Sequence, residues 1–144
     1  MTTWDGLPVS PEPPYGAAIA VWRRTASGVE WLLLHHDPAH RDPNDRPGEW
    51  DWGCPSGSRF PGEDLKVCAL RELQEETGLT LPIQPAVQDG TWPWFVAQAE
   101  TDAVVLLSDE HDAFRWVTSG EALCLIRPSH VARQFERAAG TVET

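Results

Sequence analysis

The sequence predicts a single α/β (α+β) domain in which helices pack against a mixed β-sheet. Short runs rich in apolar, β-branched and aromatic residues lie on both sides of the middle of the chain and indicate strands. A glutamate-rich segment in the middle has helix-forming composition, and a second helical segment follows near the end. A chain of 144 residues suits one hydrophobic core. This order of elements is typical of a sheet covered by helices.

The first part of the chain predicts an arm and then a β-hairpin. Residues 1–14 contain four of the 13 prolines, so we expect an extended N-terminal arm. Gly16–Arg24 has the composition of a buried strand, and Trp31–His36 is its predicted partner. Ala26-Ser27-Gly28 between them indicates a turn.

The segment between this hairpin and the central helix predicts mostly loops. Asp37–Gly48 is polar and rich in proline, which indicates a loop. Glu49–Pro55 alternates Trp50, Trp52 and Cys54, which is a weak strand pattern. Ser56–Gly62 contains two glycines and a proline, and we expect a second loop there.

The rest of the chain predicts a helix, several strands and a closing helix. The helix covers Asp64–Thr77, and Gly78 is its expected left-handed cap. Thr118 or Ser119 could cap a short helical turn over Glu121–Leu125. The other predicted elements are strands near Gln84–Gln88, Trp92–Ala99, Ala103–Leu107 and Ala113–Val117, a helix over Val131–Ala139 capped by Ser129, and a frayed tail over residues 140–144.

Composition excludes several classes of function. The formal net charge of −11 argues against general nucleic-acid binding, which requires clustered lysine and arginine. No apolar run approaches the length of about 20 residues that spans a bilayer, and the N-terminal region does not resemble a signal peptide. We therefore expect no membrane partner and a cytoplasmic location. Cys54, Cys68 and Cys124 match neither a zinc motif nor a disulfide framework.

The predicted helix over Asp64–Thr77 has an unusual distribution of charge. Leu65, Cys68, Ala69 and Leu73 form one apolar stripe at 100° per residue, the rotation of an α-helix. Glu72 and Glu76 fall within that stripe, and Glu75 lies at its edge. An ordinary amphipathic helix places such carboxylates on the opposite face.

The position of these glutamates along the helix adds two further penalties. They form like-charge pairs three and four residues apart, and the C-terminal end of a helix disfavours anions. Arg71 can reach Glu75 but cannot neutralise three carboxylates. A divalent cation could, and oxygen ligands of this kind favour Mg²⁺ or Mn²⁺ over zinc. The spacing alone leaves open a solvated acidic patch instead.

A longer motif surrounds these glutamates. Gly57 and Glu63 are followed by Arg71-Glu72-Leu73, by Glu75-Glu76 and by Gly78-Leu79, with five, seven, one and one residues in the successive gaps. The pattern resembles a complete Nudix box, the signature of the Nudix (MutT-like) hydrolases. The resemblance extends weakly over residues 16–118. It implies a Nudix-type α/β/α sandwich with a mixed sheet and a catalytic loop–helix–loop.

The resemblance also implies roles for individual residues. It identifies Glu72, Glu75 and Glu76 as ligands of Mg²⁺, with Mn²⁺ as a possible substitute, and Glu63 and Arg71 as the groups that orient them. The backbone carbonyl of Ser56 is a further expected ligand, although many family members have glycine there. A carboxylate must also accept the proton of the attacking water, and Glu75, Glu76 or Glu110 could do so. Asp109 is the competitor of Glu110 for this role.

Tryptophans are the main candidates for recognising the substrate. Eight of them is a high number for this length, and an aromatic face can stack on a nucleobase. The residues that we predict to contact the substrate are Trp50, Trp52, Trp94 and Arg59.

The predicted function is cleavage of a diphosphate linkage by a metal-activated water. Nucleoside triphosphates and dinucleoside polyphosphates are the leading substrate classes that the resemblance implies. ADP-ribose or a nucleotide sugar is an alternative substrate, and a catalytically inactive nucleotide-binding module is an alternative function. The expected partner is thus a small nucleotide-like molecule, and the oligomeric state stays open.

Overall fold

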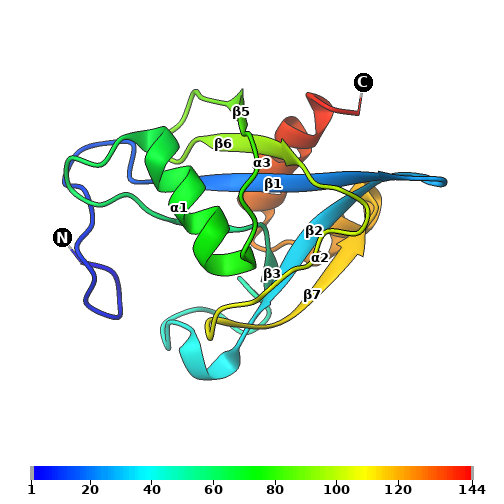
Figure 1. The fold of residues 1–144 in the computed structure, drawn as a ribbon. Helices are drawn as coiled ribbons and strands as arrows, with labels where there is room; N and C mark the ends of the chain where they lie inside the picture. The colour runs from blue at the N-terminus through cyan, green and yellow to red at the C-terminus, as the bar shows by residue number, and fades with distance from the viewer. Residues whose placement is uncertain (1, 144) are drawn as a thin grey trace.

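The computed structural model describes residues 2–143 and contains one mixed sheet. The central path of the sheet has the strand order β3-β2-β1-β6-β5, while β4 pairs with β1 and β7 pairs with β2 (Figure 1). The strands are β1 (Gly16–Thr25), β2 (Gly28–His36), β3 (Trp52–Gly53), β4 (Ser56–Ser58), β5 (Gln84–Val87), β6 (Trp94–Gln98) and β7 (His111–Val117). The α-helices are α1 (Leu65–Thr77), α2 (Ser119–Leu125) and α3 (Ser129–Gly140), and Pro38–His40 form a short 3₁₀ helix.

Strand pairing makes the sheet mixed, as predicted. β1 pairs antiparallel with β2, where Trp22 lies opposite Trp31. On its other side β1 runs parallel to β6, with Ile19 opposite Phe95. Because β1 lies between these two neighbours, it is buried along most of its length. This explains why its sequence is almost continuously apolar rather than alternating.

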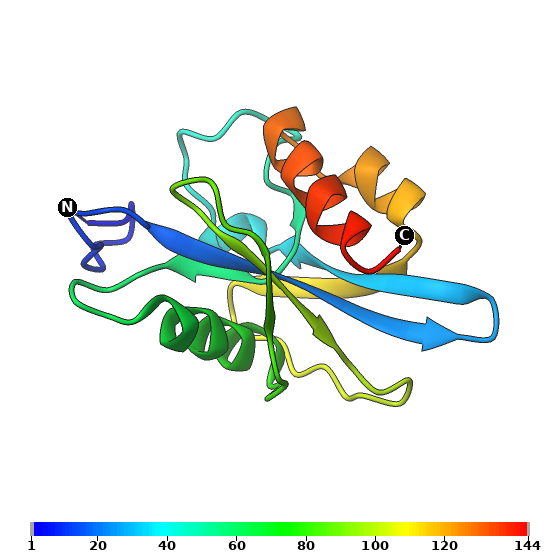
Figure 2. The ribbon, with the colours of Figure 1, turned by 90° about the horizontal axis from the view of Figure 1, so that it is seen from above.

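The helices cover both faces of the sheet. Figure 2 shows α1 on one side and α2 and α3 on the other. Alternate residues of β1 enter the two cores, with Ile19 packed on the α1 side and Ala20 on the α3 side. Leu73 anchors α1 in the first core and Phe135 anchors α3 in the second. The predicted α/β/α sandwich is confirmed.

The central helix ends at Thr77, as the sequence predicts, and begins one residue later than predicted, at Leu65, because Asp64 is its N-cap. The Asp64 carboxylate accepts hydrogen bonds from the backbone N–H groups of Lys66 and Val67. At the other end Gly78 has φ of 73°, and its N–H donates to the carbonyl of Gln74. Glu76 is buried on the core-facing side together with Leu73, as the face analysis predicts.

Two predicted elements between the hairpin and α1 differ from the structure. Only Trp52–Gly53 of the predicted strand Glu49–Pro55 pairs within the sheet. The predicted loop Ser56–Gly62 is wrong at its start, because Ser56–Ser58 form β4 and pair with β1. Serine and glycine are poor strand formers, and tertiary pairing with a buried central strand overrides that preference.

The predicted strand Ala103–Leu107 is also wrong. The segment forms no strand, and Val104 and Leu106 are exposed. Its continuous apolar run has the composition of a strand, but among the described residues its backbone bonds to α1 only through the Leu106 N–H, which donates to the Thr77 carbonyl. A local pattern does not provide a neighbouring strand.

The ends of the chain contact the domain. The arm doubles back, with a bridge between Thr2 and Pro8, and it buries Val9 and Ser10. In the segment predicted to fray, the Glu143 carboxylate accepts hydrogen bonds from Trp31 Nε1 at 2.6 Å and from Ser119 Oγ at 2.8 Å. Met1 and Thr144 lie outside the described residues.

The structure decides how the two C-terminal helices begin. Thr118 caps α2, and its side chain and that of Glu121 form a reciprocal capping box. The predicted cap of the closing helix is wrong, because Ser129 is its first residue and Pro128 occupies the cap without a side-chain bond. No helix in residues 2–143 is long and apolar enough to cross a membrane.

Candidate active site

The two glutamates on the core-facing side of α1 lie against β4, the short strand that precedes the helix. The Glu76 side chain is only 5 % exposed, and its Oε1 accepts a hydrogen bond from the Ser56 N–H at 3.3 Å. The Glu72 side chain is 12 % exposed and packs on Gly57. A Cβ at Gly57 would lie 2.0 Å from Glu72 Cδ, so only glycine leaves room for this carboxylate.

Arg71 connects the helix to the segment that precedes it. Its guanidinium donates to both carboxylate oxygens of Glu63, at 2.8 and 2.9 Å, and to Glu72 Oε1 at 2.8 Å. It also donates to the carbonyl of Ser58 at 3.0 Å, whereas Glu75 is a longer contact at 3.4 Å. The bonded Arg71 side chain lowers the pKa of Glu63. Arg71 and Glu63 thus form one rigid support for Glu72.

Burial makes the charge on Glu76 costly. Burial, a hydrogen bond with Glu72 and the negative charges of Glu72 and Glu110 raise the pKa of Glu76 well above its ordinary value. Burial also raises the pKa of Glu72, and the bonds with Glu76 and Arg71 partly offset this effect. The raised pKa values favour a protonated carboxyl in this pair, and a bound cation would favour the ionised forms.

The donor set at this pair fits a hard divalent cation. Carboxylate oxygens converge in a glycine cradle that a Cβ would fill, and Mg²⁺ prefers such oxygen ligands. Within residues 2–143, however, no three acidic, imidazole or thiol groups are already arranged as a ligand set. Glu75 does not complete such a set with Glu72 and Glu76, because its side chain is 53 % exposed and contacts Arg71. Glu72 and Glu76 are the pre-formed part of the candidate site.

A histidine that the sequence did not single out adjoins the pair. His111 Nε2 lies 4.0 Å from Glu76 Oε1, and burial lowers the pKa of His111 to about 4. The neutral ring leaves its buried Nδ1 without a hydrogen-bond partner. The neighbouring Glu110 is exposed and lines the same cavity as Glu76, which Asp109 does not.

These groups open into a cavity of about 580 Å³, which we call the tryptophan cavity. Its polar lining includes Ser56, Glu76, Glu110 and His111. Its aromatic lining consists of Trp4, Trp50, Trp52, Trp92 and Trp94. The volume is in the usual range of small-molecule sites, roughly 300–1,000 Å³.

The predicted substrate contacts occupy different environments. Trp50, Trp52 and Trp94 all line the tryptophan cavity. Trp94 is buried, and its Nε1 donates to Gln134 Oε1 at 3.1 Å. Trp50 is 42 % exposed and has φ of 66°, a left-handed conformation that is rare for a bulky residue. Its N–H donates to the Arg127 carbonyl, which holds the strained backbone in place.

Arg59 does not line the tryptophan cavity. Its guanidinium donates to the carbonyls of Pro14, Glu63 and Glu12 and to Ser10 Oγ, at 2.7 to 3.0 Å. Arg59 therefore fastens the N-terminal arm to the loop before α1. A direct contact with substrate would require Arg59 to leave these four partners.

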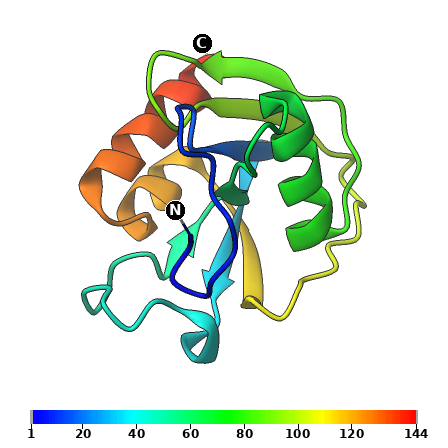
Figure 3. The same cartoon turned by 90° about the vertical axis from the view of Figure 1, so that its left-hand side faces the viewer.

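The arm supplies a residue that the sequence did not indicate. Figure 3 shows the arm, in blue, crossing one end of the molecule. Trp4 lines the tryptophan cavity although its side chain is 53 % exposed. The only sequence signals there were prolines and glycine, and these do not show where an arm folds back. The sequence also did not indicate Arg127, which lies in the α2–α3 connection and lines the cavity, because no local pattern shows where that connection packs.

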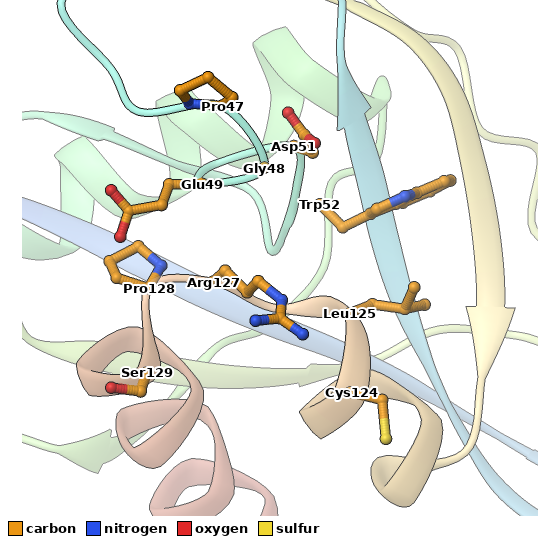
Figure 4. Close-up of a pocket in the computed structure, with 10 residues that line it drawn as sticks. All are labelled: Pro47, Gly48, Glu49, Asp51, Trp52, Cys124, Leu125, Arg127, Pro128 and Ser129. Atoms are coloured by element: carbon orange, nitrogen blue, oxygen red, sulfur yellow. The ribbon is translucent and has the colours of Figure 1, made fainter.

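A second cavity of about 590 Å³ adjoins the first (Figure 4). We call it the outer cavity, and Trp52 and Arg127 line both. Its other walls come from the segment before β3, including Glu49, and from the end of α2 and start of α3, including Cys124, Leu125 and Ser129.

Comparison with known proteins gives the family. The NUDIX domain family model matches residues 14–137. A bis(5'-nucleosyl)-tetraphosphatase (asymmetrical) of Rattus norvegicus is 32 % identical over 131 residues, covering 80 % of this chain and 77 % of that protein. The enzyme of the same name from Sus scrofa is 31 % identical over 111 residues, covering 67 % and 69 %.

The fold has counterparts among solved structures. A binary complex of a C. elegans Ap4A hydrolase superposes with a TM-score of 0.69 at 23 % identity, covering 89 % of this chain and 98 % of that one. Fold, motif and family match agree, and the resemblance found in the sequence is confirmed. The chain belongs to the Nudix hydrolases and is a hydrolase that acts on pyrophosphate bonds.

Proposed function

We propose that this protein is a Mg²⁺-dependent pyrophosphohydrolase of nucleoside polyphosphates, with dinucleoside tetraphosphates and nucleoside triphosphates as the substrates to test first. The observation that carries the proposal is the buried Glu72–Glu76 pair on Gly57, which adjoins a cavity lined by tryptophans. An acidic pair alone would repel a polyphosphate. A cation bound between the glutamate pair and the phosphate groups would remove this repulsion and attract the polyphosphate.

The residues that would hold the ion are Glu72, Glu75, Glu76 and the backbone carbonyl of Ser56. Mn²⁺ could replace Mg²⁺, because the same oxygen ligands suit both ions. Such an ion supplies neutralisation of the phosphate charge and a water of lowered pKa. Glu75 would have to turn from Arg71 toward Glu72, a movement that its exposure permits.

The remaining polar groups have positioning and proton-transfer roles in this proposal. Glu63 and Arg71 fix the Glu72 carboxylate through direct bonds. Glu76, Glu75 or Glu110 accepts the proton of the attacking water, and the exposed Glu110 can pass it to solvent. His111 stays neutral and contributes shape and hydrogen bonding rather than charge.

The tryptophans would recognise the nucleoside. Every nucleobase has a flat π-face, and a base stacked on an aromatic side chain is stabilised by roughly 1–3 kcal/mol. Trp4 and Trp50 are the exposed members of the aromatic lining, so they are free to stack, whereas Trp94 is already buried and hydrogen-bonded. The name of the Rattus norvegicus relative gives a bis(5'-nucleosyl) tetraphosphate as its substrate. This supports a dinucleoside tetraphosphate as a substrate to test for this chain.

The test is a panel of nucleoside triphosphates, dinucleoside tetraphosphates and nucleotide sugars with Mg²⁺ in ¹⁸O-labelled water. We expect hydrolysis of at least one of the first two classes, and the labelled product identifies the phosphorus that is attacked. Glu76→Gln should lower kcat by about 100-fold or more, as expected for loss of a group that acts on the reacting water. Glu100→Gln, an exposed control, should not. Hydrolysis of none of the nucleotides, or full activity of Glu76→Gln, would contradict the proposal.

A further inference from the structure

Arg127 is the only arginine or lysine that lines either of the two cavities among the described residues 2–143. In that part of the chain its guanidinium forms no hydrogen bond or ion pair, whereas Arg41 and Arg71 are each bonded to carboxylates. A free guanidinium in a protein of net charge −11 is available to an anion from solution. Because Arg127 borders both cavities, that anion can extend from one into the other.

The outer cavity has the chemistry for a nucleoside. Figure 4 shows the Arg127 side chain between Glu49 on one side and Leu125 and Cys124 on the other. The Glu49 carboxylate has no bonded partner within residues 2–143 and can accept hydrogen bonds from ribose hydroxyls or base amino groups. Trp52 and Leu125 add apolar surface. The volume of about 590 Å³ matches that of the tryptophan cavity.

We propose that the outer cavity binds the second nucleoside of a dinucleoside polyphosphate, and that Arg127 binds the phosphate chain where it passes between the cavities. The inference rests on the proposed function and narrows its substrate to a nucleotide with two nucleosides. A nucleoside triphosphate would fill the tryptophan cavity and leave the outer cavity to solvent. The two substrate classes should therefore respond differently when the outer cavity is blocked.

Cys124 gives a way to block it. The thiol is exposed and lines the outer cavity, whereas burial raises the pKa of both the Cys54 and Cys68 thiols and disfavours their reaction. The native enzyme is labelled with a bulky maleimide, single labelling is verified by mass, and kcat and KM are measured for both substrates with Mg²⁺. We expect KM for the dinucleoside tetraphosphate to rise about tenfold or more, the loss of one nucleoside's contacts. The values for the nucleoside triphosphate should not change.

Two variants serve as controls, each compared with itself before and after exposure to the maleimide. Cys124→Ser should show the same kcat and KM before and after exposure, which excludes an effect of reaction at Cys54. Ser27→Cys in the Cys124→Ser background carries the label on the exposed hairpin turn, and labelling should not change its kcat or KM either. Cys124→Trp fills the outer cavity without chemistry and should reproduce the selective rise in KM.

The outcomes separate this inference from the proposed function. Equal values before and after labelling, or equal losses for both substrates, would overturn the second-nucleoside site. Hydrolysis of nucleoside triphosphates alone would overturn it too, while the proposed function would stand. If the unlabelled protein hydrolyses neither substrate, the proposed function fails and the inference fails with it.

Discussion

The acidic part of the candidate site and its aromatic part are built in opposite ways. Glu63, Arg71, Glu72 and Glu76 come from one continuous segment, which a capped helix and its preceding loop bring together. The five tryptophans of the cavity come from the N-terminal arm, the segment before β3, β3 itself, the β5–β6 connection and β6. The chemical groups are thus fixed by local geometry, whereas the recognition surface depends on packing between distant segments. This difference predicts which substitutions affect catalysis and which affect binding.

The largest expected effect is at the centre of the acidic part. Arg71→Ala should lower the free energy of unfolding by about 3 kcal/mol, because it leaves the largely buried Glu63 and Glu72 carboxylates unpaired. Chemical denaturation of the two proteins measures this difference in the free energy of unfolding. Arg137→Ala is the matched control, since Arg137 forms a bidentate pair with Asp89 on the surface and should change stability little. Similar losses in both variants would show that the Arg71 network is no more important than a surface pair.

The second effect concerns metal and pH. The pKa of Glu76 is raised in the folded protein, so above its ordinary pKa of 4.5 the folded protein retains a proton that the unfolded chain has lost. The metal-free protein should therefore lose stability as pH rises from 4.5 through that raised pKa, and then level off. A bound cation favours the ionised form, so Mg²⁺ should raise Tm more at high pH than at low pH. At 100 times its Kd the ion should stabilise by about 2.7 kcal/mol.

Thermal unfolding with and without Mg²⁺ across this pH range makes the measurement. K⁺ at equal ionic strength is the control for general screening. A stabilisation by Mg²⁺ that does not change with pH would count against the Glu72–Glu76 pair as its site.

The third effect tests the glycine cradle. Gly57→Ala places a Cβ where the Glu72 carboxyl lies, so we expect kcat/KM to fall about 10- to 100-fold through displacement of that group. Gly140→Ala is the matched control, because nothing lies within 4 Å of its Cβ, its backbone is not left-handed and it lines neither cavity. Both activities are measured at saturating Mg²⁺ and again in a Mg²⁺ titration. A normal Mg²⁺ dependence in Gly57→Ala would contradict the displacement.

The smallest effect concerns the aromatic part. Trp4→Ala should raise KM about tenfold and leave kcat and Tm unchanged, because the exposed indole stabilises ligand rather than core. Leu7→Ala, an exposed apolar residue on the same arm that does not line the cavity, should leave KM unchanged. Equal KM values for these two variants would remove the arm from substrate recognition.

The sequence predicted the elements that local rules control. The end of α1 followed from Gly78, whose left-handed capping geometry depends on a few neighbouring residues, and its length followed from helix-forming residues without an interior glycine or proline. The buried Glu76 followed from helical periodicity, because a carboxylate seven or eleven residues after Leu65 must face the core with it. The predicted strand Ala103–Leu107 was wrong because its apolar run has the composition of a strand, but among the described residues no strand pairs with it. β4 was missed because pairing with β1 imposes its conformation on Ser56–Ser58.

By itself the sequence determined the helix α1, the glutamates on its core-facing side and the motif that identifies the family. All of these lie within 23 residues, from Gly57 to Leu79, where spacing along the chain fixes spacing in space. Only the tertiary structure decided that Trp4 and Arg127 line the cavities and that Arg59 holds the arm instead. The physical reason is that these contacts join distant parts of the chain, since Trp4 and Arg127 lie more than a hundred positions apart and Arg59 lies 45 positions from Pro14, so they depend on how the sheet and its helices pack.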